Sequence, residues 1–197
     1  MNLLAVDATH DVLTVAVERG GKVYRASRRG QNSHDDNLWP AVDAVLKKAK
    51  LGLDDLDAVA AASGPGRFTG IRIGLSFAAA LSYALKIPAV AVSRLEADAD
   101  RREGAEVTAV LPGWKGEVYH QRFKRVKNGA LKAMSKAEWT APEAWAGAKD
   151  LKETAAEHLL PAARRALKSK KLPPLEPFYL KPAGYEKNRP AHGNPKR

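Results

Sequence analysis

The sequence of 197 residues contains no cysteine, which excludes disulfide bonds and thiolate chemistry. Residues 1–7 carry no basic region and no long apolar stretch, so a signal peptide is not expected. The most apolar helical stretch, residues 70–86, is too short for a membrane span and carries Arg72 and Lys86. We therefore expect a cytoplasmic protein without membrane contact.

The common motifs of hydrolytic active sites are also absent. No two of the five histidines stand three or four positions apart, so a helical zinc motif is missing, and the chain has no Gly-x-Ser-x-Gly elbow. His34 lies beside Asp35 and Asp36, a grouping that could suggest a metal or acid–base site. Because no second histidine stands at ligand spacing, polarity at a helix start explains the grouping better. We expect no catalytic residue and no metal ligand.

Basic residues outnumber acidic residues, but only in the second half of the chain. Residues 1–100 hold 12 Lys and Arg against 12 Asp and Glu, whereas residues 101–197 hold 21 against 10, which accounts for the whole net charge of +11. The asymmetry suggests a polyanion or an acidic partner near the second half, although a solvated surface also explains it. Without interleaved aromatic residues, it is weak evidence for specific RNA recognition.

The chain is organised around residues 58–92. A run of small and β-branched residues, a glycine-rich turn over residues 64–70, a helix over residues 70–86 and a second apolar run predict a βαβ unit and a parallel sheet. The helix has almost no polar face, so it needs cover on both sides. A second layer of this chain or a partner could supply that cover, and the small residues 78–80 would let another helix approach closely.

The glycine-rich turn resembles a phosphate-binding loop only superficially. A P-loop requires Lys followed by Ser or Thr after its last glycine, but Ile71 and Arg72 stand there. A dinucleotide-binding loop requires a glycine at the position of Thr69 and an acidic residue about twenty positions further on, and both are missing. We expect a tight strand-to-helix turn capped by Thr69.

The first half of the chain predicts a sheet with two helices. Residues 3–6 and 12–17 read as strands, and a Gly20-Gly21 turn leads into a third strand that begins at Val23. Asp7 follows the first strand and could cap the turn there. Residues 32–49 predict an amphipathic helix with Pro40 in its first turn and a stripe of apolar residues, namely Leu38, Val42, Val45 and Ala49, widened by Trp39 and Leu46.

The second half predicts a smaller α/β unit. Ser93 and Glu96 form a capping-box pattern before a short helix, and residues 107–111 and 117–126 predict strands joined by a turn. Helix starts are expected at Thr140 and Thr154. We expect an N-terminal lobe over residues 1–96, a C-terminal lobe over residues 97–182 and a basic, disordered or partner-ordered tail over residues 183–197.

The glycine-rich turn also carries a family resemblance. It is similar to the signature of the TsaB (YeaZ) family, the non-catalytic partner of TsaD in making threonylcarbamoyladenosine on tRNA, through the run Gly64-Pro65-Gly66-Arg67-Phe68-Thr69-Gly70-Ile71-Arg72-Ile73-Gly74. Residues 116–119 and 177–182 resemble further family elements. The resemblance implies the actin-like ATPase fold of sugar kinases, heat-shock chaperones and actin, with two lobes of mixed sheets flanked by helices.

The same resemblance implies a helical interface with TsaD or with a second copy of the chain. Of the family's usual residues in the first helix the chain keeps His34, Leu38 and Pro40, with Trp39 in place of a leucine. The residues expected to contact the partner are His34, Leu38, Trp39, Val42, Val45, Arg72, Leu75 and Ala79.

Two departures from the fold family predict a degenerate nucleotide site. The stretch from Asp7 to Thr9 stands where actin-like ATPases carry a phosphate loop with an Asp and a glycine, but the glycine is absent. Pro112 and Trp114 replace the Asp and the Arg that related proteins carry before the Gly-Glu-Val-Tyr element, so Trp114 is expected to take a packing role. Phosphoryl transfer needs charge stabilisation that Pro112 cannot supply.

The resemblance therefore predicts a subunit without chemistry of its own that binds and stabilises a TsaD-like transferase. ATP and magnesium would serve the complex through other subunits, including a TsaE-like ATPase, and tRNA would be reached through the complex; alone, the chain could form a homodimer. The alternatives are an active ATPase or small-molecule kinase of the same fold, and a basic RNA-binding module acting alone.

Overall fold

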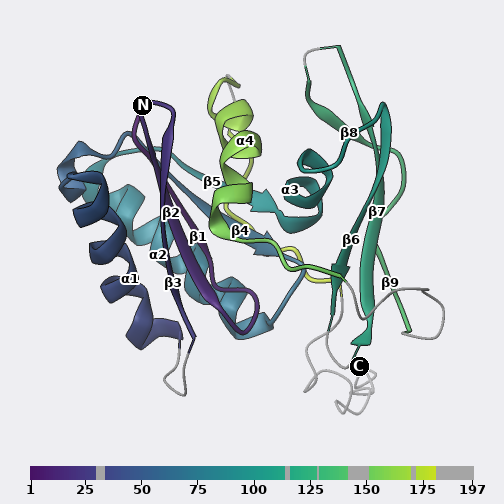
Figure 1. The fold of residues 1–197 in the computed structure, drawn as a ribbon, viewed down its shortest axis with the longest axis horizontal. Coiled ribbons are helices and arrows are strands. Elements are labelled where there is room, and N and C mark those ends of the chain that lie inside the picture. Colours follow the sequence, from purple (N-terminus) through teal and green to yellow (C-terminus); the bar gives the residue numbers. More distant parts are fainter. Residues whose placement is uncertain (30–33, 114–115, 128, 142–150, 170–171, 181–197) are drawn as a thin grey trace, which may run out of the picture.

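The computed structural model describes residues 1–29, 34–113, 116–127, 129–141, 151–169 and 172–180. It has two lobes, each built on one sheet, with helices on both faces of the first sheet and a short helix between the lobes (Figure 1). The expected α/β architecture of mixed sheets flanked by helices is confirmed.

The first sheet has the strand order β3-β2-β1-β4-β5. Its strands are β1 (Leu3–Asp7), β2 (Leu13–Arg19), β3 (Lys22–Arg28), β4 (Ala58–Gly64) and β5 (Ala89–Ser93). Strands β1, β4 and β5 are parallel to one another, and β2 pairs antiparallel with both β1 and β3. Both the βαβ unit and the opening hairpin are therefore confirmed. The hairpin turns through Gly20 and Gly21, whose φ angles of +55° and +80° favour glycine.

Alternation along the strands places successive residues on opposite faces of this sheet. On β1, Leu4 and Val6 pack with α1 (His34–Ala49) and α2 (Phe68–Leu85), whereas Leu3 and Ala5 pack with α4 (Ala156–Leu167). The face beneath α4 is rich in alanine, which lets this helix lie close to the strands. Because α4 covers the first sheet, the expected division after residue 96 is wrong for this helix (Figure 1).

The second sheet is thinner. Its strands are β6 (Glu106–Pro112), β7 (Val118–Arg125), β8 (Leu131–Ala133) and β9 (Glu138–Thr140), with β7 bonded to all three others. The helix α3 (Arg94–Asp100) packs on one face through Leu95 and Ala99. A short 3-10 turn, η1 (Leu53–Asp55), precedes β4.

Several helix starts differ from the sequence predictions. Helix α2 begins at Phe68 with Arg67 as its cap residue, so Thr69 lies inside the helix and does not cap it. Ser93 precedes α3 but makes no side-chain capping bond, and Glu96 pairs with Arg165 at 2.9 Å. Pro40 stands inside α1 rather than in its first turn. Thr140, expected at a helix start, instead ends the strand β9. Residues 142–150 and the tail over residues 183–197 lie outside the described residues.

Candidate functional site: the inter-lobe cleft and the exposed helix face

A cleft of about 1340 Å³ lies between the lobes. The turn after β1, the glycine-rich turn before α2 and the turn after β6 all line it, through residues that include Thr9, Gly66, Gly70 and Pro112. The fold therefore brings together the loops that the sequence assigned to a degenerate nucleotide site.

Asp7 is fully buried at the end of β1 and satisfied entirely by protein groups. One of its carboxylate oxygens accepts hydrogen bonds from the backbone N–H and the hydroxyl of Thr9, at 3.0 and 2.5 Å. The other oxygen accepts a bond from the hydroxyl of Thr154 at 3.2 Å and lies 3.5 Å from Nε of Arg94. Burial alone would raise the pKa of Asp7, but Arg94, His10 and the Thr9 bonds outweigh it and hold the pKa below its ordinary value of 3.8.

Arg94 is the cation at the centre of this network and is only 1% exposed. Its guanidinium donates from Nε to the hydroxyl of Thr154 at 2.8 Å and from Nη1 to the carbonyl oxygen of Pro65 at 2.7 Å. Nη2 donates to the carboxylate of Glu153. The cation beside the buried carboxylate of Asp7 is thus Arg94, a side chain of the protein itself.

The glycine-rich turn packs on the turn after β1 instead of opening toward a ligand. A Cβ atom at Gly70 would collide with the carbonyl oxygen of Ala8, and one at Gly66 would lie 2.5 Å from the carbonyl oxygen of Thr9. The N–H of Arg67 donates to that same Thr9 oxygen at 2.7 Å. The close approach therefore requires glycine for packing between two loops, as the tight-turn interpretation predicted.

The opposite side of the cleft offers little to a metal. At the end of β6, Pro112 supplies no carboxylate, and the N–H of Gly113 donates to the carbonyl oxygen of Glu117 at 2.6 Å. Within the part of the chain that the structure describes, no three His, Asp or Glu side chains form a group that could hold a metal ion. The residues do not fit the magnesium–nucleotide pair of actin-like ATPases, because Asp7 is already paired with Arg94. Trp114 lies outside the described residues.

The second candidate region is the outer face of α1 and α2, where only some of the expected partner-contacting residues are accessible. Trp39 is 49% exposed and packs edge-on against Phe77, with ring centroids 5.1 Å apart. Arg72 and Ala79 are also exposed. His34 instead anchors the start of α1, because its Nε2 lies 2.6 Å from the carbonyl oxygen of His10.

Four of the expected contact residues belong to the core. Their placement at an interface is wrong for this chain, because the apolar stripes of α1 and α2 face the first sheet; these residues are Leu38, Val42, Val45 and Leu75. The exposed face of α2 instead presents small residues beside Tyr83, which is 89% exposed. Tyr83 was not among the residues predicted to contact a partner, although an aromatic residue one turn beyond Ala79 was the available signal.

Helix α2 is also long and apolar enough to cross a membrane by length and composition, a test that core helices pass as well. Here its inner face packs against β4 through residues such as Ile71 and Ala78. One side is thus covered by the chain's own sheet, and on the other side Ser76, Ala79 and Ala80 are exposed among the described residues.

The segment over residues 172–180 crosses the start of α2, a contact that the sequence did not predict. The N–H of Phe178 donates to the carbonyl oxygen of Ser63 at 2.7 Å, and Tyr179 stacks on Phe68 with centroids 4.7 Å apart. Arg72 lies over the Phe68 ring at 3.8 Å and donates to the Tyr179 hydroxyl at 3.1 Å. The aromatic pair between prolines was the sequence signal for this docking.

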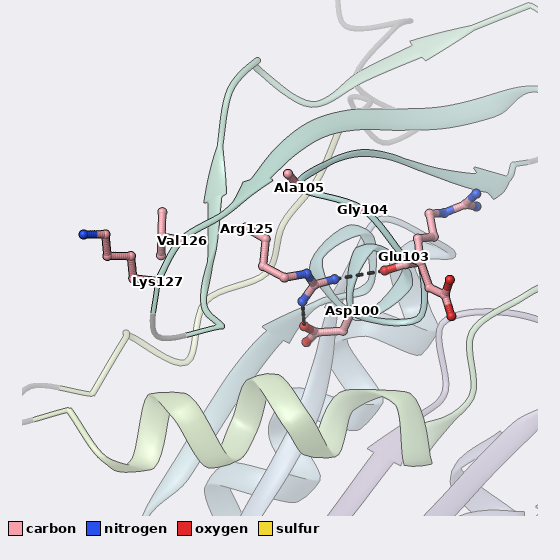
Figure 2. A pocket seen from close by; sticks show the side chains of 8 residues that line it. Asp100, Glu103, Gly104, Ala105, Arg125, Val126 and Lys127 are labelled. Atoms are coloured by element: carbon pink, nitrogen blue, oxygen red, sulfur yellow. Dashed lines mark hydrogen bonds and ion pairs between the residues drawn. The ribbon is translucent and has the colours of Figure 1, made fainter.

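A smaller hollow of about 630 Å³ lies between α3 and the β6–β7 edge (Figure 2). Arg125 extends from β7 across it, donating to the carbonyl oxygen of Arg102 at 2.9 Å and lying 3.8 Å from the carboxylate of Asp100 (Figure 2). These contacts tie α3 to the second sheet and leave the guanidinium of Arg125 occupied.

Comparison with known proteins assigns the chain to a family. The model of the family described as "TsaD: tRNA N6-adenosine threonylcarbamoyltransferase" matches residues 25–149, well over half of the chain. A protein of Escherichia coli named "tRNA threonylcarbamoyladenosine biosynthesis protein TsaB" is 33% identical over 133 residues, which cover 66% of this chain and 58% of that protein. A protein of the same name from Buchnera aphidicola is 39% identical over 127 residues, covering 62% and 60%.

Solved structures similar to this chain indicate the same family. A crystal structure from Pseudomonas aeruginosa, described as similar to peptidase YeaZ, superposes with a TM-score of 0.74 at 25% identity and covers 91% of this chain and 99% of that one. A structure described as YeaZ from the same organism gives a TM-score of 0.72. The matched region spans about three fifths of the curated relatives' length. The chain belongs to the family of the threonylcarbamoyltransferase model and, within it, to the TsaB (YeaZ) proteins.

Proposed function

We propose that this chain is a non-catalytic subunit in the synthesis of threonylcarbamoyladenosine on tRNA. It binds and stabilises a TsaD-like transferase through the outer face of α1 and α2. The name shared by its curated relatives supports the pathway. The observation that carries the subunit role is the face of α2 that is exposed among the described residues, where small residues lie between Arg72 and Tyr83 and beside Trp39.

The cleft supports a role without chemistry. Its buried carboxylate, Asp7, is already paired with Arg94, and Pro112 stands where a second acid would be needed. A subunit without its own site can still raise the activity of a transferase by binding only its folded, competent form, since such binding increases the population of that form.

The remaining partners follow from this role. ATP and magnesium are used by other subunits of the complex, including a TsaE-like ATPase, and the chain reaches tRNA through the complex in the cytoplasm. In the absence of the transferase, the same face of α2 pairs two copies of the chain, because small residues such as Ala79 and Ala80 allow two helices to approach closely.

Size-exclusion chromatography with light scattering tests the proposal, using the chain, the TsaD-like subunit of the same organism and their mixture. We expect a new stoichiometric peak, and binding at least about tenfold weaker for Trp39→Ala, because a tryptophan at an interface centre is commonly a hot spot. Trp139→Ala is the matched control, since this tryptophan is 44% exposed on the other lobe. Unchanged binding by Trp39→Ala, or no complex at micromolar concentrations, contradicts the proposal.

A direct contact between the second lobe and tRNA is a second candidate, favoured by one feature of its sheet. Lys124 on β7 lies directly opposite Lys132 on β8, and the Glu106 carboxylate, 4.0 Å from Lys124, is shared with Arg122. Like charges directly opposite each other are destabilising, so a bound polyanion would relieve this pair. Changing both lysines to Glu should weaken tRNA binding and reduce its salt dependence. An unchanged salt dependence would remove this candidate while leaving the binding of the transferase untouched.

A further inference from the structure

We propose that Arg94 is a built-in substitute for a divalent cation and that it fixes the two lobes without any ligand. All four groups around its guanidinium present oxygen atoms: the carboxylates of Asp7 and Glu153, the hydroxyl of Thr154 and the carbonyl of Pro65. Two carboxylates, a hydroxyl and a backbone carbonyl form the kind of oxygen set that hard cations such as Ca²⁺ prefer. Here a guanidinium lies among them instead.

The position of Arg94 in the fold gives it a mechanical role. Its oxygen partners come from the end of β1, the turn before α2 and the segment that leads into α4, which all belong to the first lobe. Arg94 itself begins α3, whose residues Leu95 and Ala99 pack on the second sheet (Figure 1). A planar guanidinium with several fixed donors holds such a junction in one geometry.

Because Arg94 and Asp7 are buried, the guanidinium stays in the place of a divalent cation. Arg94 is 1% exposed and Asp7 is fully buried, so neither group can turn out into water without loss of the other's partner. In an actin-like ATPase the cleft closes around a ligand that carries a bound cation, whereas in this chain the cation is the guanidinium of Arg94. The lobes are therefore expected to keep one relative orientation whether or not magnesium and nucleotide are present.

The variant Arg94→Ser of the full chain tests the inference, because it removes the guanidinium and leaves the oxygen set in place. We expect its melting temperature in EDTA to fall by about 10 °C, since an uncompensated buried carboxylate remains. Ca²⁺ should then raise the melting temperature in a concentration-dependent manner, and Mn²⁺ binding should appear in electron paramagnetic resonance. The parent chain should show neither response.

Two further variants separate cation binding from general effects. Arg94→Lys keeps a positive charge in place and should show no response to Ca²⁺. The double variant Asp7→Asn with Arg94→Ser should lose the response, because the central carboxylate is gone. If Arg94→Ser does not fold in EDTA, refolding in millimolar Ca²⁺ supports the inference. An Arg94→Ser chain that neither binds nor is rescued by any cation, or a parent that binds Mn²⁺ equally well, overturns it.

Discussion

The sheets of the two lobes are covered to different extents. The first sheet is covered on both faces, by α1 and α2 on one side and α4 on the other, and its central strand β1 is fully buried. The second sheet is covered on one face, by α3 and residues such as Phe178, and no described helix lies on its other face (Figure 1). The stability of the chain is therefore expected to reside in the first lobe.

The charges follow the same division. In the first lobe, Asp7 is fully buried and pairs with Arg94, which is also buried. On the second sheet, Arg122 and Lys124 are more than half exposed and share the single carboxylate of Glu106. Exposed pairs of this kind contribute little to stability, so the second lobe is left available for electrostatic contact with other molecules.

A substitution in the core beneath α4 tests most directly whether the first lobe contributes more stability than the second. Leu159 is completely buried between this helix and the alanine-rich face of the first sheet, so Leu159→Ala should lower the free energy of unfolding by about 4 kcal/mol. Leu131→Ala, at a half-buried position on the second sheet, should cost about 1 kcal/mol. Chemical denaturation measures both; equal losses would show that the lobes contribute alike.

The ion pair that joins the lobes should give the next largest effect. Asp7→Asn leaves the buried charge of Arg94 with only the partly exposed carboxylate of Glu153, and we expect a loss of about 3 kcal/mol. Because the folded pKa of Asp7 lies below 3.8, this carboxylate stabilises the fold above that pH and ceases to do so as the pH falls through the folded value. Unfolding measured against pH should thus show a smaller acid-induced loss for Asp7→Asn than for the parent.

The smallest effect should come from a histidine on α4. Nδ1 of His158 accepts a hydrogen bond from the N–H of Ala155 at 2.9 Å, and burial lowers the pKa of His158 below 6.5. As the pH falls through 6.5, the unfolded chain takes up a proton at this histidine before the folded chain does, so this group reduces stability there. His158→Gln should flatten that part of the pH–stability curve; an unchanged slope would contradict this assignment.

Local sequence patterns predicted most of the elements. Runs of apolar and β-branched residues placed β1, β2 and the β4–α2–β5 unit, and the Gly20-Gly21 pair placed the hairpin, because these features depend only on neighbours in the chain. The same patterns misplaced the start of α2. There Thr69 was expected to cap the helix, but the N–H of Arg67 is instead held by the carbonyl oxygen of Thr9 from a distant loop.

The sequence by itself determined which segments form strands and helices, the lack of a thiol or helical zinc site, and the family signature around Gly66 and Gly70. Only the tertiary structure decided that α4 covers the first sheet, that Tyr83 rather than Leu75 faces outward, and that Arg94 neutralises Asp7. The partners in these contacts are up to 147 positions apart, as Thr154 is from Asp7. Residue spacing fixes local periodicity, whereas contacts at such separations depend on how the completed elements pack together.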